Sequence, residues 1–246
     1  MRSSCKRLAE VGALLREAVT EGITTADIDA MAEDKILSMG SKPAFKGYSV
    51  DGVPPFPATI CASPNEQVVH GIPNRTPLKD GDIISIDMGL HHGGYYADMA
   101  FTVAVGEPSK EVQNLLDVTQ QSLYDGIAAA QAGRRIGDIG HAIESTIKPH
   151  GLGIVRQYVG HGIGRALHER PSVPNYGKPN TGDLIKPGMC LALEPMVTMG
   201  TWRTKTLKDK WTVVTADGSL AAHFEHTIAI TPTGTELLTV LEGDSF

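Results

Sequence analysis

The chain has 246 residues, of which 41% are hydrophobic and 20% charged, as in ordinary globular proteins of one large or two small domains. A formal net charge of −6 excludes an overall basic surface for nucleic acid or an anionic membrane. Three cysteines at unrelated spacings (Cys5, Cys61 and Cys190) indicate free thiols in a reducing compartment. Because no apolar run reaches the length of a membrane span or signal sequence, we expect a cytoplasmic protein.

The first 70 residues predict two helices, a long loop and two short strands. Apolar residues recur at helical spacing over about 4–20, and a second helix begins at Thr24-Thr25 and ends before Gly40. Residues 41–57 are rich in proline, glycine and aromatic residues. This segment is longer than most structureless loops, so we expect it to line a site. Residues 58–69 then predict two short strands.

Residues 82–105 predict a β-hairpin, because two apolar, β-branched runs flank the turn sequence HHGG. We place the tight turn at His92 and Gly93, which sets Asp87 opposite Asp98. Two facing carboxylates inside apolar strands repel each other, so a cation between them would explain the pair. The alternatives are a salt-bridged pair, or a bulge that turns one aspartate to solvent.

The second half predicts a similar series of elements. Helices are expected over about 110–131 and 137–148, and a strand over 154–159 that ends at Gly160-His161-Gly162. A loop containing His168 follows, and a strand over 189–193 leads into Glu194. We expect a last hairpin from residues 211–215 and 219–231, whose second strand carries Glu225.

The two halves resemble each other. Four matches recur in the same order: LKDGDIISID (78–87) with IKPGMCLALE (185–194), GITTADI (22–28) with GRRIGDI (133–139), VHGI (69–72) with GHGI (160–163), and the strand of Asp98 with that of Glu225. We therefore predict an α+β fold of two pseudo-symmetric αβ halves, about 1–106 and 107–246. Together they would form one catalytic domain, with an antiparallel sheet covered by helices on its outer face.

A pseudo-twofold between the halves would bring four acids together: Asp87, Asp98, Glu194 and Glu225. Burying four carboxylates without neutralisation would cost many kcal/mol. Two divalent cations would balance the charge, as in two-metal hydrolytic sites. Ligands rich in oxygen favour ions such as Mn, Fe or Co over a thiolate zinc site.

The histidines differ in what their positions predict. His70 and His161 match between the halves, and each ends a strand beside glycines that would let a ligand approach the backbone closely. His223 and His226 flank Glu225 on a predicted strand, so we expect both side chains to point away from the one between them.

Seven ordered motifs resemble the type I methionine aminopeptidases over essentially the whole chain. They are HGIP (70–73), DGDIISID (80–87), YYAD (95–98), GHGIG with LHE (160–164 and 167–169), LALEP (191–195), WTVVT (211–215) and FEHTI (224–228). The resemblance implies the pita-bread fold around a dinuclear metal site. It also implies removal of the N-terminal methionine from peptides and nascent proteins, with a preference for a small second residue.

The resemblance implies a role for ten residues. The metal ligands would be Asp87, Asp98, His161, Glu194 and Glu225, of which Asp98 and Glu225 bridge two divalent ions (Co, Mn, Fe or Zn). Glu194 would also carry the proton of the metal-bound hydroxide, His168 would hydrogen-bond the scissile carbonyl or its oxyanion, and His70 would contact the substrate amide. Phe56, Cys61 and Trp211 would line the methionine pocket, since polarizable walls suit a thioether.

The sequence departs from this family at the pocket. The loop before Cys61 is longer than usual, which leaves open whether Tyr48 occupies the position of the family's pocket tyrosine. Leu167 stands where an aromatic residue is often found. The chain also lacks the zinc-binding amino-terminal extension of eukaryotic cytosolic members, which favours a bacterial-type enzyme, and we expect a monomer that contacts the ribosome transiently.

Two other interpretations fit the same fold. Aminopeptidase P and prolidase share the ligand set but carry an additional amino-terminal domain, for which 246 residues leave no room. Some proteins of this fold are non-catalytic binding modules that have lost metal ligands, whereas all five predicted ligands are present here.

Overall fold

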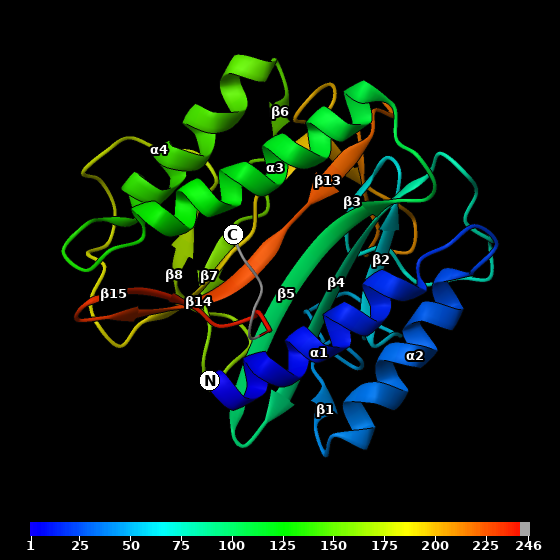
Figure 1. Ribbon diagram of the computed structural model, residues 1–246, viewed down its shortest axis with the longest axis horizontal. Helices are drawn as coiled ribbons and strands as arrows, with labels where there is room; N and C mark the ends of the chain where they lie inside the picture. The colour runs from blue at the N-terminus through cyan, green and yellow to red at the C-terminus, as the bar shows by residue number, and fades with distance from the viewer. Residues whose placement is uncertain (242–246) are drawn as a thin grey trace.

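The computed structural model describes residues 1–241, and its centre is a large twisted antiparallel sheet (Figure 1). The strands follow the order β1-β4-β5-β14-β9-β7-β8, with β2 paired to β4 and β15 paired to β14. Their bounds are β1 (Lys42–Pro43), β2 (Ile60–Pro64), β4 (Ile83–His92), β5 (Tyr95–Ala104), β7 (Gly160–Gly162), β8 (Glu169–Val173), β9 (Cys190–Leu193), β14 (Glu225–Thr231) and β15 (Gly234–Leu237). The first and second parts of the chain therefore meet where β5 pairs with β14.

Two smaller sheets of three strands each complete the β structure. One follows the order β13-β10-β6 and the other β11-β12-β3. Their bounds are β3 (Gln67–Val69), β6 (Gly153–Ile154), β10 (Met196–Thr198), β11 (Thr204–Thr206), β12 (Val213–Thr215) and β13 (Ala221–His223).

Three predictions for the second half are wrong. The strand expected over 154–159 is two short strands, β6 and β7, in different sheets. The loop that follows His168 contains β8. The hairpin expected over 211–231 does not form either, because β12 pairs with β11 and β3, β13 pairs with β10, and β14 lies in the large sheet.

The hairpin of β4 and β5 forms as predicted, but its turn lies one residue later. Gly93 and Gly94 occupy the turn with φ of 57° and 85°. A two-residue hairpin turn of this type needs positive φ at both positions, which glycine adopts without strain and histidine does not. Asp98 therefore pairs with Gly89, and Asp87 pairs with Ala100. The two aspartates, expected to be directly opposite, are therefore diagonal neighbours, and they still lie on one face of the sheet.

Four α-helices cover one side of the large sheet, in the pairs α1 with α2 and α3 with α4 (Figure 1). Their bounds are α1 (Arg2–Ala18), α2 (Thr25–Ser38), α3 (Lys110–Ala129) and α4 (Ile136–Ile147), with a 3₁₀ turn η1 (Lys148–His150) after α4. The predicted helices are thus confirmed.

At the start of α2 the Thr24 hydroxyl accepts from the Asp27 N–H at 3.1 Å, while the Asp27 carboxylate accepts from the Thr24 N–H at 3.1 Å. This reciprocal capping fixes where the helix begins.

The helices determine which strand residues face the opposite side. Helix α1 lies so close to the sheet that a Cβ on Gly12 would be 3.0 Å from Met99 Cε and 3.8 Å from Met88 Sδ. Since side chains alternate along a strand, Asp87 and Asp98 face away from α1.

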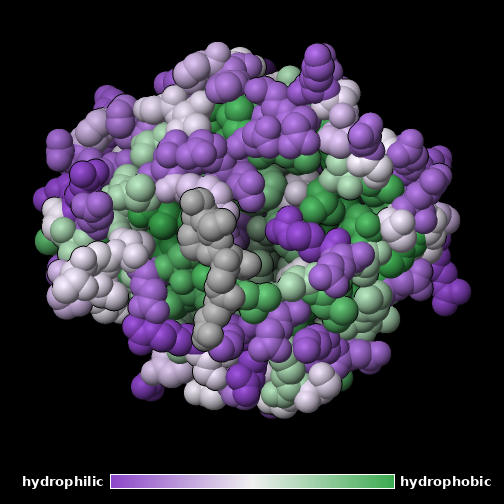
Figure 2. All heavy atoms as spheres, in the orientation of Figure 1, coloured by the Kyte–Doolittle hydropathy of each residue, from purple (hydrophilic) through white to green (hydrophobic). Residues whose placement is uncertain are grey.

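Helix α3 has the same effect on β14. The His226 ring stacks on Tyr124 of α3, with ring centroids 6.1 Å apart, so Glu225 faces away from the helices as well. Figure 2 shows the helix side, where hydrophobic surface is visible between α1 and α3 and most of the rim is hydrophilic. Within residues 1–241, no helix has the length and apolarity that crossing a membrane requires.

Candidate metal centre and substrate cavity

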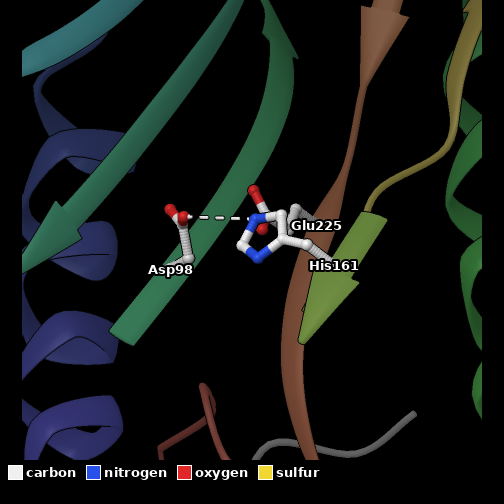
Figure 3. A group of neighbouring side chains, drawn as sticks. All are labelled: Asp98, His161 and Glu225. Carbon is white, nitrogen blue, oxygen red and sulfur yellow. Dashed lines mark ion pairs between the residues drawn. The ribbon is translucent and has the colours of Figure 1, made fainter. Parts of the chain in front are cut away.

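Three buried side chains from three strands converge on the face opposite the helices. Asp98 comes from β5, His161 from β7 and Glu225 from β14, and their nearest nitrogen and oxygen atoms all lie within 4.8 Å of one another (Figure 3). The Asp98 and Glu225 side chains come from adjacent, directly paired strands. Asp98 lies in the first part of the chain and Glu225 near its end, so the pairing of β5 with β14 brings together two acids that are far apart in the sequence.

Further polar groups surround these three. His161 Nε2 lies 3.8 Å from Asp98 Oδ2 and 3.6 Å from Glu194 Oε1. On the other side of Glu194, His223 Nε2 lies 3.8 Å from Glu194 Oε2 and 4.0 Å from Glu225 Oε2. Asp87 lines the same cavity and pairs across the ladder with Cys61 of β2.

The electrostatics of the four acids favour a nearby positive charge. Burial, together with the neighbouring carboxylates, raises the pKa of Asp98, Glu194 and Glu225 well above the ordinary range. Burial raises the pKa of Asp87 to about 7, against the opposing effect of a hydrogen bond from Cys61. Among the described residues, Asp98 Oδ1 and Glu225 Oε1 are buried without any hydrogen-bond partner. Orphaned carboxylate oxygens in a cluster of acids fit a divalent cation.

His161 is oriented as a metal ligand would be. Its Nδ1–H donates to the Gly162 carbonyl at 2.9 Å, which leaves the lone pair of Nε2 facing Asp98 and Glu194. Burial lowers the pKa of this imidazole to about 4, so the ring is neutral at physiological pH. A backbone acceptor on the second nitrogen is the usual support of a ligating histidine.

The glycines beside His161 serve a different purpose from the one expected. A Cβ on Gly160 would lie 2.3 Å from the Ala192 carbonyl oxygen, and one on Gly162 would lie 2.3 Å from that of Arg170. These glycines let the neighbouring strands approach β7, where we had expected them to make room for a ligand. They fix the position of His161 by allowing β7 to fit between β8 and β9.

The raised carboxyl pKa values predict how stability depends on pH. A carboxyl group whose pKa is raised by folding stabilises the fold fully below its unfolded pKa of about 4 and loses that contribution as the pH rises through the folded value. Between pH 7.5 and 9 the histidines of lowered pKa are neutral in both states, because histidine in the unfolded chain titrates near pH 6.5, so they do not oppose the trend. We expect the melting temperature of metal-free protein to fall across this range.

Saturating Mn²⁺ should abolish or reverse this fall, because the cation replaces the protons on the acids. Differential scanning calorimetry with and without the metal measures both slopes. Glu225→Gln is the control, and it should flatten the metal-free slope because it removes one acid from the cluster. A metal-free melting temperature that rises between pH 7.5 and 9 would contradict the interpretation.

An apolar cavity of about 320 Å³ opens directly beside the acids. All ten residues predicted for the site line it: Phe56, Cys61, His70, Asp87, Asp98, His161, His168, Glu194, Trp211 and Glu225. Trp211 packs edge to face on Phe56, with centroids 5.3 Å apart, and its Nε1–H donates to the Pro54 carbonyl at 2.8 Å. The cavity therefore has an apolar end of fixed shape and an acidic end.

Some cavity residues were not predicted. Phe45 and Val50 come from the long loop 41–57, which was expected to line a site because of its aromatic residues, Phe45 among them, but neither was assigned to the cavity. Tyr48, whose place was left open, and Leu167 also line the cavity. His223 was expected to point away from Glu225, which is wrong because the two lie two residues apart, and residues at that spacing in an extended chain share one face.

Comparisons with known proteins agree with this geometry. Residues 1–232 match the model of metallopeptidase family M24. A methionine aminopeptidase of Clostridium perfringens is 48% identical over 242 residues, covering 98% of this chain and 95% of the relative. The crystal structure of methionine aminopeptidase from Thermotoga maritima superposes with a TM-score of 0.94 at 42% identity, over 98% of this chain and 95% of that one. A prolidase from Pyrococcus furiosus is 21% identical with a TM-score of 0.76, and this chain covers 63% of it, so the two share a fold.

Proposed function

This chain belongs to the methionine aminopeptidases of metallopeptidase family M24, and from that premise we propose which of its residues carry out the reaction. The enzyme removes the N-terminal methionine from a peptide in a metal-dependent reaction, and its fold is the pita-bread fold. The proposal concerns the roles of the site residues, the number and identity of the metal ions, and the partners.

We assign the metal ions to five ligands: Asp87, Asp98, His161, Glu194 and Glu225. The observation that carries this assignment is the convergence of Asp98, His161 and Glu225 with carboxylate oxygens that have no other partner in the part of the chain that the structure describes. Four carboxylates against a single neutral imidazole favour two divalent ions, of the Co, Mn, Fe or Zn type. When bound, such ions polarise the carbonyl of the first peptide bond and make a coordinated water acidic enough to attack it.

The remaining roles follow from the positions of the side chains in the cavity. Glu194 lies beside His161 and His223 at the acidic end, where its carboxylate can take the proton of the attacking water and pass it to the leaving amine. His168 lies against His161, with ring centroids 4.4 Å apart, and donates to the carbonyl oxygen as negative charge develops. His70, whose ring meets Trp211 at 6.1 Å, contacts the substrate amide.

The apolar end would hold the methionine side chain. Phe56 and Cys61 are almost fully buried, and Trp211 closes the wall that they begin. A thioether in such a cavity keeps its apolar contacts and needs no charged partner, whereas a charged side chain would be buried without one. We therefore propose selectivity for unbranched apolar side chains at this end.

The test of the assignment is a metal titration of chelator-treated protein by isothermal titration calorimetry, with release of methionine from Met-Ala-Ser measured at each ratio of Mn²⁺ to protein. We expect binding of up to two ions and activity that rises with occupancy. The control peptide is acetyl-Met-Ala-Ser, which lacks the free amine. A protein that binds no divalent ion would refute the assignment of the ligands.

Cys61 should contribute shape and not chemistry. Burial, followed by the charge of Asp87, raises the pKa of its thiol, so the nucleophilic thiolate is disfavoured. We expect Cys61→Ser to keep measurable turnover with an altered KM for Met-Ala-Ser. Cys190→Ser, at a half-buried thiol of the same sheet that does not line the cavity, is the matched control. Loss of all turnover in Cys61→Ser with both metals still bound would overturn this role.

The assignments of domain organisation, oligomeric state, location and partners rest on the resemblance to the family and on exposed residues. We propose that residues 1–106 and 107–246 form a single catalytic domain, since β5 and β14 pair directly between them. A monomer, a cytoplasmic location, a preference for a small second residue, and the absence of a specific nucleic acid or membrane partner remain proposals. So does a transient contact with the ribosome, for which the exposed Arg203, Lys205 and Lys208 provide basic side chains.

A further inference from the structure

The long loop before Cys61 keeps its two ends together. The Phe56 N–H donates to the Tyr48 carbonyl at 2.9 Å, and the Gly47 N–H donates to the Phe56 carbonyl at 2.8 Å. The Tyr48 N–H in turn donates to the Phe45 carbonyl at 2.8 Å. Residues 49–55 are therefore a closed excursion, and the backbone of Tyr48 is held in place at its base.

Two further contacts hold the excursion against the β11–β12 connection. Lys210 Nζ donates to the Gly52 carbonyl at 3.3 Å, and Trp211 Nε1 donates to the Pro54 carbonyl at 2.8 Å. The loop thus has a fixed position relative to the cavity, and the Tyr48 side chain at its base points into that cavity.

The Tyr48 hydroxyl reaches one ring nitrogen of His168. Tyr48 Oη lies 3.0 Å from His168 Nδ1, and the two rings meet edge to face at 5.5 Å. Both side chains line the cavity beside the acids. In a neutral imidazole one nitrogen carries the proton and the other accepts a hydrogen bond, so the partner at Nδ1 decides what Nε2 can do.

The direction of this hydrogen bond depends on the tautomer of His168. Within residues 1–241, His168 Nδ1 is the one hydrogen-bond partner of the Tyr48 hydroxyl, so the phenol proton finds a protein acceptor when it points to Nδ1. Donation from Tyr48 leaves Nδ1 without a proton and places the proton on Nε2. The opposite direction would leave Nε2 as an acceptor, which cannot stabilise negative charge on a carbonyl oxygen.

We propose that Tyr48 is a positioning residue that holds His168 in the tautomer with Nε2–H, and so makes this ring a donor to the scissile carbonyl. The inference rests on the donor role proposed above for His168. The hydroxyl of Tyr48 does not touch the reacting atoms. It acts by removing the competing tautomer and by fixing the plane of the ring, which is how a carboxylate or a backbone carbonyl commonly supports a functional histidine.

The test combines a spectroscopic and a kinetic measurement on Tyr48→Phe, which keeps the ring and removes the hydroxyl. The ¹⁵N chemical shifts of zinc-loaded protein should show His168 protonated at Nε2 in the wild type and as a mixture of tautomers in the variant. The kcat for Met-Ala-Ser should fall about tenfold, the factor that one well-placed hydrogen bond is worth, with KM changed less than twofold.

A double-mutant cycle separates this role from a role in pocket shape. In a His168→Ala background the same Tyr48→Phe change should cost less than twofold, because the ring that it positions is absent. Tyr158→Phe is the matched control, since Tyr158 meets the other histidine, His70, by ring contact at 5.5 Å. It should leave both the His168 signals and kcat within twofold of wild type.

Three results would overturn the inference: a wild-type His168 protonated at Nδ1, an unchanged tautomer in Tyr48→Phe, or a cost of Tyr48→Phe that is the same with and without His168. The ¹⁵N measurement needs no turnover. A wild-type enzyme that releases no methionine would therefore contradict the proposed function and would leave the tautomer to be decided by its own signals.

Discussion

Asp98→Ala and Glu225→Ala are each expected to abolish metal loading and turnover together. The two acids lie on the paired strands β5 and β14, and each has a buried oxygen with no hydrogen-bond partner among the described residues. We propose that each bridges two ions, so removal of either would empty both positions. Metal content by mass spectrometry, measured beside methionine release from Met-Ala-Ser, checks the two effects in the same samples.

The melting temperature of the metal-free variants separates loss of metal from loss of fold. Removing one acid also removes repulsion among buried carboxylates, so we expect metal-free Asp98→Ala to melt no lower than metal-free wild type. Glu107→Ala, at an exposed glutamate just after β5, is the matched control and should change neither metal content nor rate. Retention of two metals with near-normal turnover in either bridging variant would refute the assignment.

The second large effect is expected at His168. We expect His168→Ala to lower turnover by about 10²–10³, the usual cost of losing one donor to developing negative charge, while metal content stays close to that of wild type. His161→Ala should instead lose metal, because the Nε2 of His161 faces Asp98 and Glu194. The two rings are in contact, so the pair tests whether neighbouring histidines have different functions.

Metal content and rate, measured for both variants, distinguish a metal ligand from a donor to the substrate. His141→Ala, at an exposed histidine of α4, is the matched control for loss of an imidazole and should resemble wild type in both measurements. If His161→Ala and His168→Ala lost metal to the same extent, the two roles would have been assigned wrongly.

The four helices could be predicted because their signals are local, and the ten residues that line the cavity could be identified from the repeat and from the ordered motifs, while their roles stay predictions. Amphipathic spacing and capping residues define each helix, and the repeat between the halves pairs Asp98 with Glu225. The turn of the first hairpin was predicted one residue early because two adjacent sequences, His92-Gly93 and Gly93-Gly94, both suit a tight turn. The conformational preference of glycine at two consecutive positive-φ positions decides between them.

The strand pairings of the second half could not be predicted from local patterns. Residues 211–215 and 219–231 look like a hairpin around Asp217-Gly218, yet β12 pairs with β3, which lies about 140 residues earlier in the chain. The choice depends on which distant strand offers a matching apolar face, which short-range periodicity does not encode. His223 is a different case, since its place beside Glu194 and Glu225 follows from local spacing: it lies two residues before Glu225 and so shares its face.

The pairing of β5 with β14 has a consequence for the order in which a newly made chain becomes active. Strand β5 ends at Ala104, and its neighbour in the sheet, β14, begins at Glu225. During synthesis the edge of β5 therefore stays unpaired while more than a hundred further residues are added. During that time Asp87 and Asp98 also lack Glu194 and Glu225, the acids that complete the cluster. The metal centre is therefore completed late, and the cation binds after β14 has paired with β5 and stabilises the sheet that has formed. An enzyme that removes the N-terminal methionine of other chains cannot act until nearly all of its own chain has been made.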